Sequence, residues 1–373
     1  MADDSILFST IATASGHRFG RATLNAPASL NALSLEMVDR LGAQLEAWAA
    51  DAEVAGVVLD ATGEKAFCAG GDVLGLRRSA LETTPGEVPA HAAAFFEREY
   101  RVDYRIHTFP KPVLAWGHGI VMGGGIGLLA GASHRVVTEK TRLAMPEVAI
   151  GLHPDVGGSW LLGRAPGRSG LFLALTGAPM NASDACFAGL ADLVLRQADH
   201  GAVLEAIAGA AWSGEPTRDG TTLSQLLAAR GAGVERPASA LRTHLDRIDA
   251  VIGHDRVVDI APRLAALATD ADPWLANAGA AFAKGSPTSA LLAFEMQRRV
   301  RHLSLADAFR LEYQASVGCC MHGDFPEGVR ALLVDKDKSP RWHPPTLAEV
   351  DAVRIEAHLA PRFTGPHPLA DLR

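Results

Sequence analysis

The segment VLAWGHGIVMGGGIGLLA (113–130) decides the fold class of this chain. An apolar run, a glycine-rich turn and the apolar body of a helix follow one another with no Asp, Glu, Lys or Arg among them. The same order begins earlier, where VAGVVLDA (54–61) precedes the glycine loop AFCAGGD (66–72). Strand, glycine turn and helix in succession indicate an α/β core in which the loops after the strands carry the functional site.

The flanking segments fit this fold class. ILFSTIATASGHRFGRATLN (6–25) predicts a β-hairpin that turns at Ser15–Gly16. Ser34 is a suitable N-cap for a helix whose apolar residues recur at helical spacing, namely Val38, Leu41, Leu45 and Trp48. HRVVTEK (134–140) and LAMPEVAIG (143–151) predict two further strands.

The composition changes after about residue 200 to Ala-rich helical stretches interrupted by Gly and Pro. SGEPTRDGTT (213–222) and GAGVERPAS (231–239) are predicted to be surface linkers. Ser286 before Pro287, and Ser304, predict the starts of two later helices. We therefore expect an α/β core over residues 1–205 and an additional helical C-terminal region over 206–373.

Composition narrows the class of protein. The chain has 373 residues and a net charge of -7, which argues against a nucleic-acid partner because phosphate binding draws on basic surface. Its four cysteines show neither CxxC spacing nor a disulfide framework, which is typical of a reducing compartment, and the pair Cys319–Cys320 is predicted to be buried thiol. We see no signal peptide, no apolar run of membrane-spanning length and no metal-ligand spacing. These features predict a soluble, cytoplasmic protein without a metal.

The glycine loops do not fit a nucleotide-binding motif. In VMGGGIG (121–127), Leu128 stands where the last glycine of GxGxxG would fall, and GEKAFCAGG (63–71) lacks the ending of a phosphate-binding loop. Two interpretations stay open. The glycines permit tight turns and close packing, or the two loops each direct a backbone N–H at one point and form an oxyanion hole.

Four motifs together resemble the crotonase (enoyl-CoA hydratase/isomerase) superfamily. In the order of that family they are SLNALSLEMVDRL (29–41), KAFCAGGD (65–72), HGIVMGGGIGLL (118–129) and MPEVAIGLHPDVGGS (145–159). The resemblance implies a spiral of ββα units that binds an acyl-CoA through its thioester carbonyl. By position it assigns the two carbonyl-binding amides to Gly71 and Gly124.

The acids favour one branch of the superfamily. Hydratases of this family use two glutamates, and the first of them would fall at Gly127, which has no side chain. The second matches Glu147, and Asp155 stands where hydratases carry a glycine. This arrangement resembles the 3-hydroxyisobutyryl-CoA hydrolase branch, as do FEREYRVDY (96–104) and GDFPEGVRALLVDKDKSPRW (323–342).

The resemblance implies a thioester hydrolase acting on a short 3-hydroxyacyl-CoA, with 3-hydroxyisobutyryl-CoA from valine breakdown expected first. Glu147 would act as general base or as nucleophile, and Asp155 would orient the 3-hydroxyl or assist proton transfer. Glu99 would face the acyl pocket. No cofactor is expected, because coenzyme A is part of the substrate. The resemblance allows a trimer, a hexamer or a monomer.

Each candidate side chain also has a purely structural interpretation. Asp155 fits a helix N-cap, Glu147 a satisfied surface acid and Glu99 a solvated helix face. Asp72 fits a helix cap and Cys68 core packing.

His153 departs from the branch, whose members usually carry phenylalanine at this position. An orientation toward solvent is favoured over a place in the site.

Two rival functions stay open. One is an enoyl-CoA hydratase or isomerase, and the other is a CoA-binding paralogue without turnover.

Overall fold

The computed structural model describes residues 4–253 and 256–373, which divide into two compact units. Unit 1 comprises Met1–Gly71, Arg101–Leu143 and Met180–Ser239, and unit 2 comprises Asp72–Tyr100, Ala144–Pro179 and Ala240–Arg373. Both units are built from segments that lie far apart in the sequence. The boundary predicted near residue 205 divides the chain into two consecutive parts, whereas each unit combines separate segments. The predicted boundary therefore stays a prediction.

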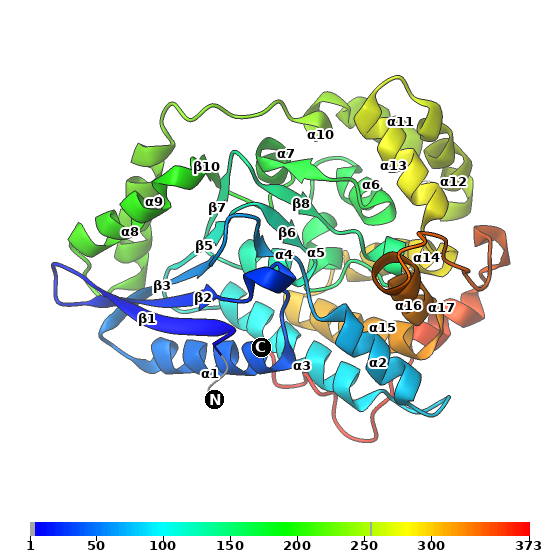
Figure 1. The fold of residues 1–373 in the computed structure, drawn as a ribbon, viewed down its shortest axis with the longest axis horizontal. Helices are drawn as coiled ribbons and strands as arrows, with labels where there is room; N and C mark the ends of the chain where they lie inside the picture. Colours follow the sequence, from blue (N-terminus) through cyan, green and yellow to red (C-terminus); the bar gives the residue numbers. More distant parts are fainter. Residues whose placement is uncertain (1–3, 254–255) are drawn as a thin grey trace. The chain divides into compact units, whose positions relative to one another are not determined.

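Unit 1 contains a six-stranded sheet in the order β1-β2-β3-β5-β7-β10 (Figure 1). Its strands are Ile6–Ala12, Arg18–Leu24, Val54–Ala61, Val113–Gly117, His134–Thr138 and Leu193–Leu195, in that order. The β1–β2 pair is antiparallel, which confirms the predicted hairpin, and the remaining pairs are parallel. A mostly parallel sheet is what strand, glycine turn and helix in succession predicted.

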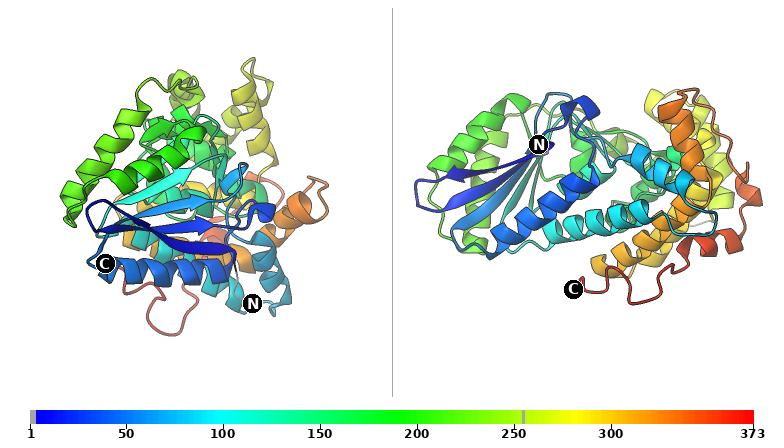
Figure 2. Two further views of the ribbon diagram at one scale, coloured as in Figure 1. Left: turned by 60° about the vertical axis from the view of Figure 1, so that its left-hand side comes forward. Right: turned by 60° about the horizontal axis from the view of Figure 1, so that its bottom comes forward.

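Helices cover both faces of this sheet. Phe19 on β2 packs against Trp212, on the side of α8 (His200–Gly209) and α9 (Pro216–Gly231). The next residue, Gly20, faces Trp48 of α1 (Leu35–Ala50). Because successive residues of a strand point to opposite faces, α1 and the α8–α9 pair lie on opposite sides of the sheet, as Figure 2 shows.

The predicted helix after Ser34 is confirmed. The Ser34 side chain accepts a hydrogen bond from Met37 N, and the predicted apolar positions of α1 are all buried. The linker predicted at 213–222 is wrong over most of its length, because Pro216 begins α9. The Glu215 carboxylate accepts from the N–H groups of Thr217 and Arg218, so the charged run caps a helix that packs on the sheet.

A second sheet has the order β4-β6-β8-β9, with strands Ala66–Cys68, Ile120–Met122, Arg142–Ala144 and Met180–Asn181. Unit 1 also contains four short helices, namely η1 (Pro27–Ser29), α4 (Gly124–Ala130), α7 (Ala182–Phe187) and η3 (Gln197–Asp199). The strand predicted over 143–151 ends at Ala144, and Glu147–Ile150 form a 3-10 helix, η2. Pro146 explains the difference, because it has no N–H to donate to a sheet and suits a helix start.

Unit 2 is almost entirely helical, and the long helix α3 (Ala90–His107) contributes its first part to this unit. Its other early helices are α2 (Val73–Glu82), η2, α5 (Gly158–Leu162) and α6 (Ser169–Thr176). The later ones are α10 (Ala240–Thr243), α11 (Leu245–Ile252), α12 (Val257–Ala266), η4 (Leu267–Thr269), α13 (Pro273–Lys284), α14 (Pro287–Val300), α15 (Leu305–Met321), α16 (Asp324–Val329), η5 (Arg330–Val334), η6 (Leu347–Glu349) and α17 (Ala352–Leu359).

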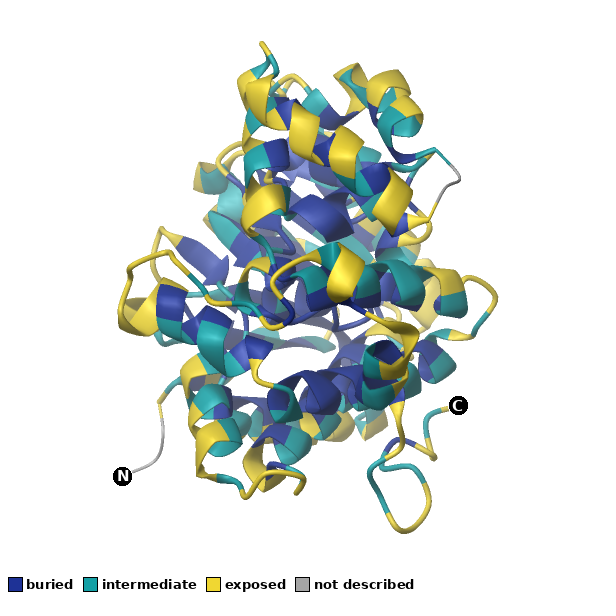
Figure 3. Ribbon diagram, turned by 90° about the vertical axis from the view of Figure 1, so that its right-hand side faces the viewer, coloured by how far each residue is buried: buried dark blue, intermediate teal, exposed yellow. Residues whose placement is uncertain are grey.

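Helix α15 forms the centre of unit 2. It packs against α2, α5, α14, α16 and α17, and most of its residues are buried. Ser286 and Ser304 cap α14 and α15 as predicted, each accepting from a backbone N–H of the first turn. In Figure 3 the buried residues are dark blue and the outer helix faces yellow. None of the described helices is long and apolar enough to cross a membrane.

Candidate active site

The two glycine loops lie side by side in unit 1. They follow β4 and β6, which are neighbouring parallel strands and therefore end at the same edge of their sheet. A Cβ on Gly70 would lie 4.0 Å from Gly124 N, and a Cβ on Gly125 would overlap the carbonyl oxygen of Cys68. The side-by-side arrangement is therefore as expected, and it requires glycine at the point of closest approach.

The amides assigned to the thioester carbonyl belong to these loops. Gly124 is the first residue of α4, so its N–H has no partner within the helix. Gly123 before it has a φ of 47°, a conformation that glycine adopts readily. Outside the regular helices and strands of the described chain, neither Gly71 N nor Gly124 N donates to a protein acceptor. Both amides are thus free to bind a ligand oxygen, and their role stays a prediction.

Three acids are buried together in unit 2. Glu99 of α3, Glu147 of η2 and Asp155, which precedes α5, are 3%, 4% and 5% exposed. The solvated and surface interpretations of Glu99 and Glu147 are therefore wrong. Among the described residues Glu99 Oε1 and Glu147 Oε2 have no hydrogen-bond partner, and no described cation forms an ion pair with any of the three acids.

Burial and mutual repulsion perturb these carboxyls. Desolvation, then the charges of Asp155 and Glu147, raise the pKa of Glu99 well above its ordinary value. Desolvation and Asp155 do the same to the pKa of Glu147. Burial also raises the pKa of Asp155, to about 6, against an opposing hydrogen bond from Tyr100. A carboxyl with a raised pKa, such as that of Asp155, is suited to general acid–base chemistry.

Helix η2, which carries Glu147, is held by the C-terminal motif of the chain. Within unit 2, α16 packs on η2 so closely that a Cβ on Gly328 would overlap the backbone of Ile150. A Cβ on Gly151, at the end of η2, would likewise overlap the backbone of Asp324. The motif 323–342 therefore fixes the backbone that presents Glu147, although it lies some 180 residues away in the sequence.

Asp155 does not cap a helix. Helix α5 has Gly157 as its N-cap, and the Asp155 carboxyl instead forms a 2.7 Å hydrogen bond with Tyr100 Oη. Tyr100 Oη also lies 2.7 Å from Ser316 Oγ, which lies 3.1 Å from His153 Nε2. The favoured orientation of His153 toward solvent is wrong, because its ring is 0% exposed.

Sequence reasoning missed Tyr100, Ser316 and Glu312 as parts of the site. Glu312 of α15 accepts from Gly157 N at 2.7 Å, from Ser159 N at 3.0 Å and from the Ser159 hydroxyl, and so caps α5. Burial raises the pKa of Glu312 to about 8, although its three donors favour the ionised form. Only spacing on α15 was available as a signal: Glu312 and Ser316 are four residues apart and share one helix face.

The remaining candidates have structural roles. Asp72 caps α2 by accepting from Gly75 N at 3.0 Å. Cys68 is fully buried in β4, and the predicted burial of the free thiols Cys319 and Cys320 is confirmed. No group of three His, Cys, Asp or Glu side chains suited to a metal ion occurs among the described residues.

Comparisons with known proteins place this site in a family. The enoyl-CoA hydratase/isomerase family profile matches residues 19–359. The chain belongs to this family. It is 39% identical to 3-hydroxyisobutyryl-CoA hydrolase, mitochondrial, of Gallus gallus over 89% of this chain and 83% of that protein. The enzyme of the same name from Danio rerio is 38% identical over 94% of this chain and 87% of that protein.

Other relatives carry different names. Small ribosomal subunit protein mS47 of Arabidopsis thaliana is 35% identical over 91% of this chain and 82% of that protein. A crystal structure named carnitinyl-CoA dehydratase, from Mycobacterium thermoresistibile, has a TM-score of 0.86 at 37% identity and covers 99% of both chains. One named enoyl-CoA hydratase, from Rhodobacter sphaeroides, has a TM-score of 0.80 at 36% identity over 96% of this chain and 97% of that chain. The expected crotonase fold and the resemblance to the hydrolase branch are confirmed.

Position 127, where the resemblance implies an acid in hydratases, has little space for a side chain here. A Cβ on Gly127 would lie 2.7–2.8 Å from the carboxyl group of Asp103, which reaches it from α3 within unit 1. Asp103 is itself buried. The space that a larger residue at 127 would require is therefore filled by a carboxylate from another helix.

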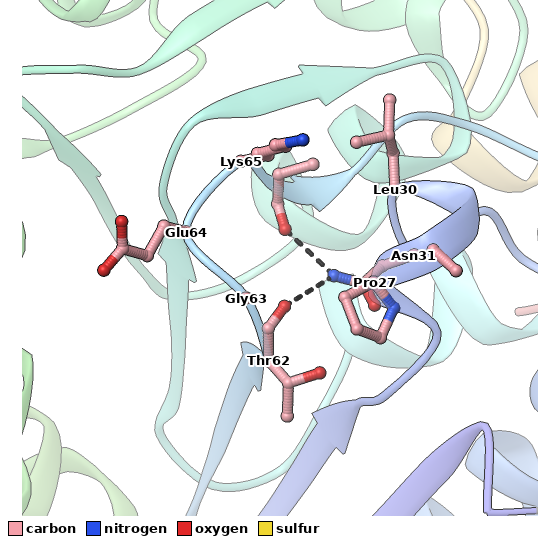
Figure 4. A pocket seen from close by; sticks show the side chains of 9 residues that line it. Pro27, Leu30, Asn31, Thr62, Gly63, Glu64 and Lys65 are labelled. Atoms are coloured by element: carbon pink, nitrogen blue, oxygen red, sulfur yellow. Dashed lines mark hydrogen bonds between the residues drawn. The ribbon is translucent and has the colours of Figure 1, made fainter.

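A cavity of about 410 Å³ lies in unit 1 beside the segment that leads into the first glycine loop. Figure 4 shows Asn31 at its wall, with its side-chain nitrogen donating to the carbonyl oxygens of Thr62 at 3.0 Å and Ala66 at 2.9 Å. Asn31 is buried. It thereby links Thr62 to the first residue of β4 and holds the loop between them.

Proposed function

We propose that this chain hydrolyses the thioester of a short 3-hydroxyacyl-CoA, with 3-hydroxyisobutyryl-CoA as its substrate. One observation carries the proposal: Glu147 and Asp155 are buried together without a cation, while position 127 holds no acid. Addition of water to a double bond in this family uses acids at 127 and 147, as the resemblance implies. Moving one acid from 127 to 155 favours attack on the thioester. The relatives named 3-hydroxyisobutyryl-CoA hydrolase support the same substrate.

The backbone amides of Gly71 and Gly124 would bind the thioester oxygen. Their loops are adjacent in unit 1, and both N–H groups are available. Two donors of this kind stabilise the negative charge that develops when the carbonyl is attacked. Loss of one such donor typically lowers the rate by about 10²–10³-fold.

Glu147 would begin the reaction. Its carboxylate either removes a proton from the attacking water or attacks the carbonyl carbon to form a mixed anhydride. A raised pKa makes the carboxylate a stronger base than an exposed glutamate. Asp155 would orient the 3-hydroxyl or transfer protons, and Glu99 would line the acyl pocket.

We propose that the protein takes part in valine breakdown. We also propose that it needs no cofactor beyond the coenzyme A of its substrate. None of the four described cysteines forms a disulfide, which supports a reducing compartment. The cytoplasm remains the proposed location, although relatives are named mitochondrial. A trimer, a hexamer and a monomer are separable by light scattering.

Steady-state assays on a panel of short acyl-CoAs test the function. We expect release of free CoA thiol from 3-hydroxyisobutyryl-CoA, matched by formation of the free acid and with no change in enoyl absorbance. Loss or gain of an enoyl thioester without thiol release would instead favour a hydratase or dehydratase, the activity named for the two structural relatives. Binding of acyl-CoA without any turnover would favour a non-catalytic paralogue.

A further inference from the structure

Four polar contacts form an unbroken chain behind Asp155 in unit 2. Asp155 Oδ2 lies 2.7 Å from Tyr100 Oη, and Tyr100 Oη lies 2.7 Å from Ser316 Oγ. Ser316 Oγ lies 3.1 Å from His153 Nε2, and His153 Nδ1 lies 3.1 Å from the carbonyl oxygen of Pro154. All four side chains are buried, so water does not replace these contacts freely.

Each contact needs one proton between its two atoms. A carbonyl oxygen only accepts hydrogen bonds, so His153 Nδ1 carries a proton toward Pro154. In neutral imidazole the other nitrogen, Nε2, is then an acceptor, and the Ser316 hydroxyl donates to it. The chain beyond this point runs through two hydroxyls, each with a single proton.

The count of protons is one short unless the chain binds an extra one. Neutral His153, Ser316 and Tyr100 supply three protons for four contacts. With Asp155 ionised, Tyr100 donates to Asp155, and the 2.7 Å contact between the Tyr100 and Ser316 oxygens is left without a proton. Two oxygens at that distance repel each other unless a proton lies between them. The geometry therefore corresponds to a chain that holds four protons.

The fourth proton has two possible positions. On Asp155, the carboxyl donates to Tyr100, Tyr100 to Ser316, and Ser316 to His153. If the fourth proton lies on His153 Nε2 instead, each of these three hydrogen bonds reverses its direction. The imidazole then carries a full positive charge in a buried position. The ring of His153 is 0% exposed, so the neutral arrangement with the proton on Asp155 is favoured.

We propose that Tyr100, Ser316 and His153 are positioning residues that hold a proton on Asp155, so that Asp155 acts as the acid of the reaction. This inference rests on the proposed function for the role of Asp155, although the placement of the proton follows from the contacts alone. His153 is essential to it, because its Nε2 accepts the Ser316 proton, which would otherwise be donated to Tyr100 Oη. The resemblance implies phenylalanine at position 153. With that residue the chain of hydrogen bonds would end at Ser316.

The groups around the chain agree with this placement. Asp155 faces the carboxyls of Glu99, Glu147 and Glu312. The thiols Cys319 and Cys320 on α15 also lie within the reach of its charge. Burial raises the pKa of Asp155 to about 6. Burial also lowers the pKa of His153 to about 4, against opposing hydrogen bonds to the backbone of Pro154 and Glu312, and both shifts favour the proton on the carboxyl.

The proposed step balances as follows. Water attacks the carbonyl carbon and gives one proton to Glu147, a new C–O bond forms, and the C–S bond breaks. The thiolate sulfur takes the proton of Asp155, which leaves CoA thiol, the carboxylic acid, ionised Asp155 and protonated Glu147. Transfer of one proton from Glu147 to Asp155 restores the resting enzyme. The hydrogen-bond chain returns to four protons at the same moment.

Two single variants test the chain through the pH profile of kcat for thiol release. His153→Phe and Ser316→Ala each remove the contact that demands the fourth proton, so ionised Asp155 is no longer disfavoured. The alkaline limb should move to lower pH by about one unit in both variants. His358→Phe removes another buried imidazole of unit 2 and should leave the limb in place.

A second measurement does not depend on activity. We expect nitrogen NMR of the wild-type protein at pH 7 to show His153 neutral with its proton on Nδ1, assigned by the loss of that signal in His153→Phe. A cationic His153, or a proton on Nε2, overturns the proposal. An unmoved alkaline limb in both His153→Phe and Ser316→Ala also overturns it. If the protein hydrolyses no acyl-CoA, the proposed function fails, and the NMR result still decides where the proton lies.

Discussion

At the scale of single residues, the site depends on which positions hold a buried carboxyl group. Glu147 and Asp155 are buried without a cation, a placement that is unfavourable unless the groups are protonated or used. Position 127, in contrast, carries no carboxyl group, and the carboxyl group of Asp103 fills the space beside Gly127. One acid position was lost and another gained, which the sequence revealed only through the resemblance.

Replacement of Gly127 tests this packing. Gly127→Ala should lower the free energy of unfolding by about 1–3 kcal/mol, because its Cβ meets the Asp103 carboxyl group. Gly201→Ala is the matched control, since it is also a helical glycine but has no atom near the added Cβ. The control should be neutral or slightly stabilising.

Denaturant melts measure the free energy of unfolding of both variants and of the double variant Gly127→Ala/Asp103→Ala. The double variant should recover part of the loss, since the contact partner is gone. Equal stabilities of Gly127→Ala and Gly201→Ala would show that Asp103 does not restrict position 127.

At the scale of elements, local signals were sufficient where a segment's partner lies nearby in the sequence. The hairpin around Ser15–Gly16 and the helix after Ser34 follow from turn and cap chemistry, and both are confirmed. The strand predicted over 143–151 is wrong beyond Ala144. Its apolar content resembles a strand, but Pro146 ends the sheet pairing. The burial of His153 and the part played by Ser316 depend on packing between segments some 160 residues apart, which no local pattern reports.

The cap of α5 shows the same limit and gives a prediction. Glu312 supplies the cap from another helix, so Glu312→Gln replaces one accepting oxygen with an NH₂ group that faces backbone donors. We expect the free energy of unfolding to fall by about 1–3 kcal/mol at pH 9. Glu215→Gln, at the solvent-exposed cap of α9, should lose less.

Urea melts of the two variants decide the point. If Glu215→Gln is as destabilising as Glu312→Gln, the buried cap has no special importance. Circular dichroism at the start of each melt verifies that both variants fold.

At the scale of the whole molecule, the buried acids make stability depend on pH. The pKa of Asp155 is about 6 in the folded chain, above the value of 3.8 expected when unfolded. A raised pKa contributes stability that is complete below about pH 3.8 and is lost as pH rises through 6. Glu312, with a pKa of about 8, extends the decline to higher pH.

We therefore expect the free energy of unfolding to fall by about 3 kcal/mol from Asp155 alone, between about pH 4 and pH 6. Asp155→Asn cannot ionise, so the decline near pH 6 should become shallower. Chemical melts at a series of pH values measure both curves. Parallel curves for the wild type and Asp155→Asn would mean that folding does not raise the pKa of Asp155.

The most direct test of the account is the rate of free CoA release from 3-hydroxyisobutyryl-CoA by Glu147→Gln, measured beside binding of the same thioester by calorimetry. The account predicts that kcat falls by about 10²–10⁴-fold while the substrate still binds and the protein remains folded. A variant that releases CoA at the rate of the wild type would show that the buried carboxyl of Glu147 takes no part in breaking the thioester.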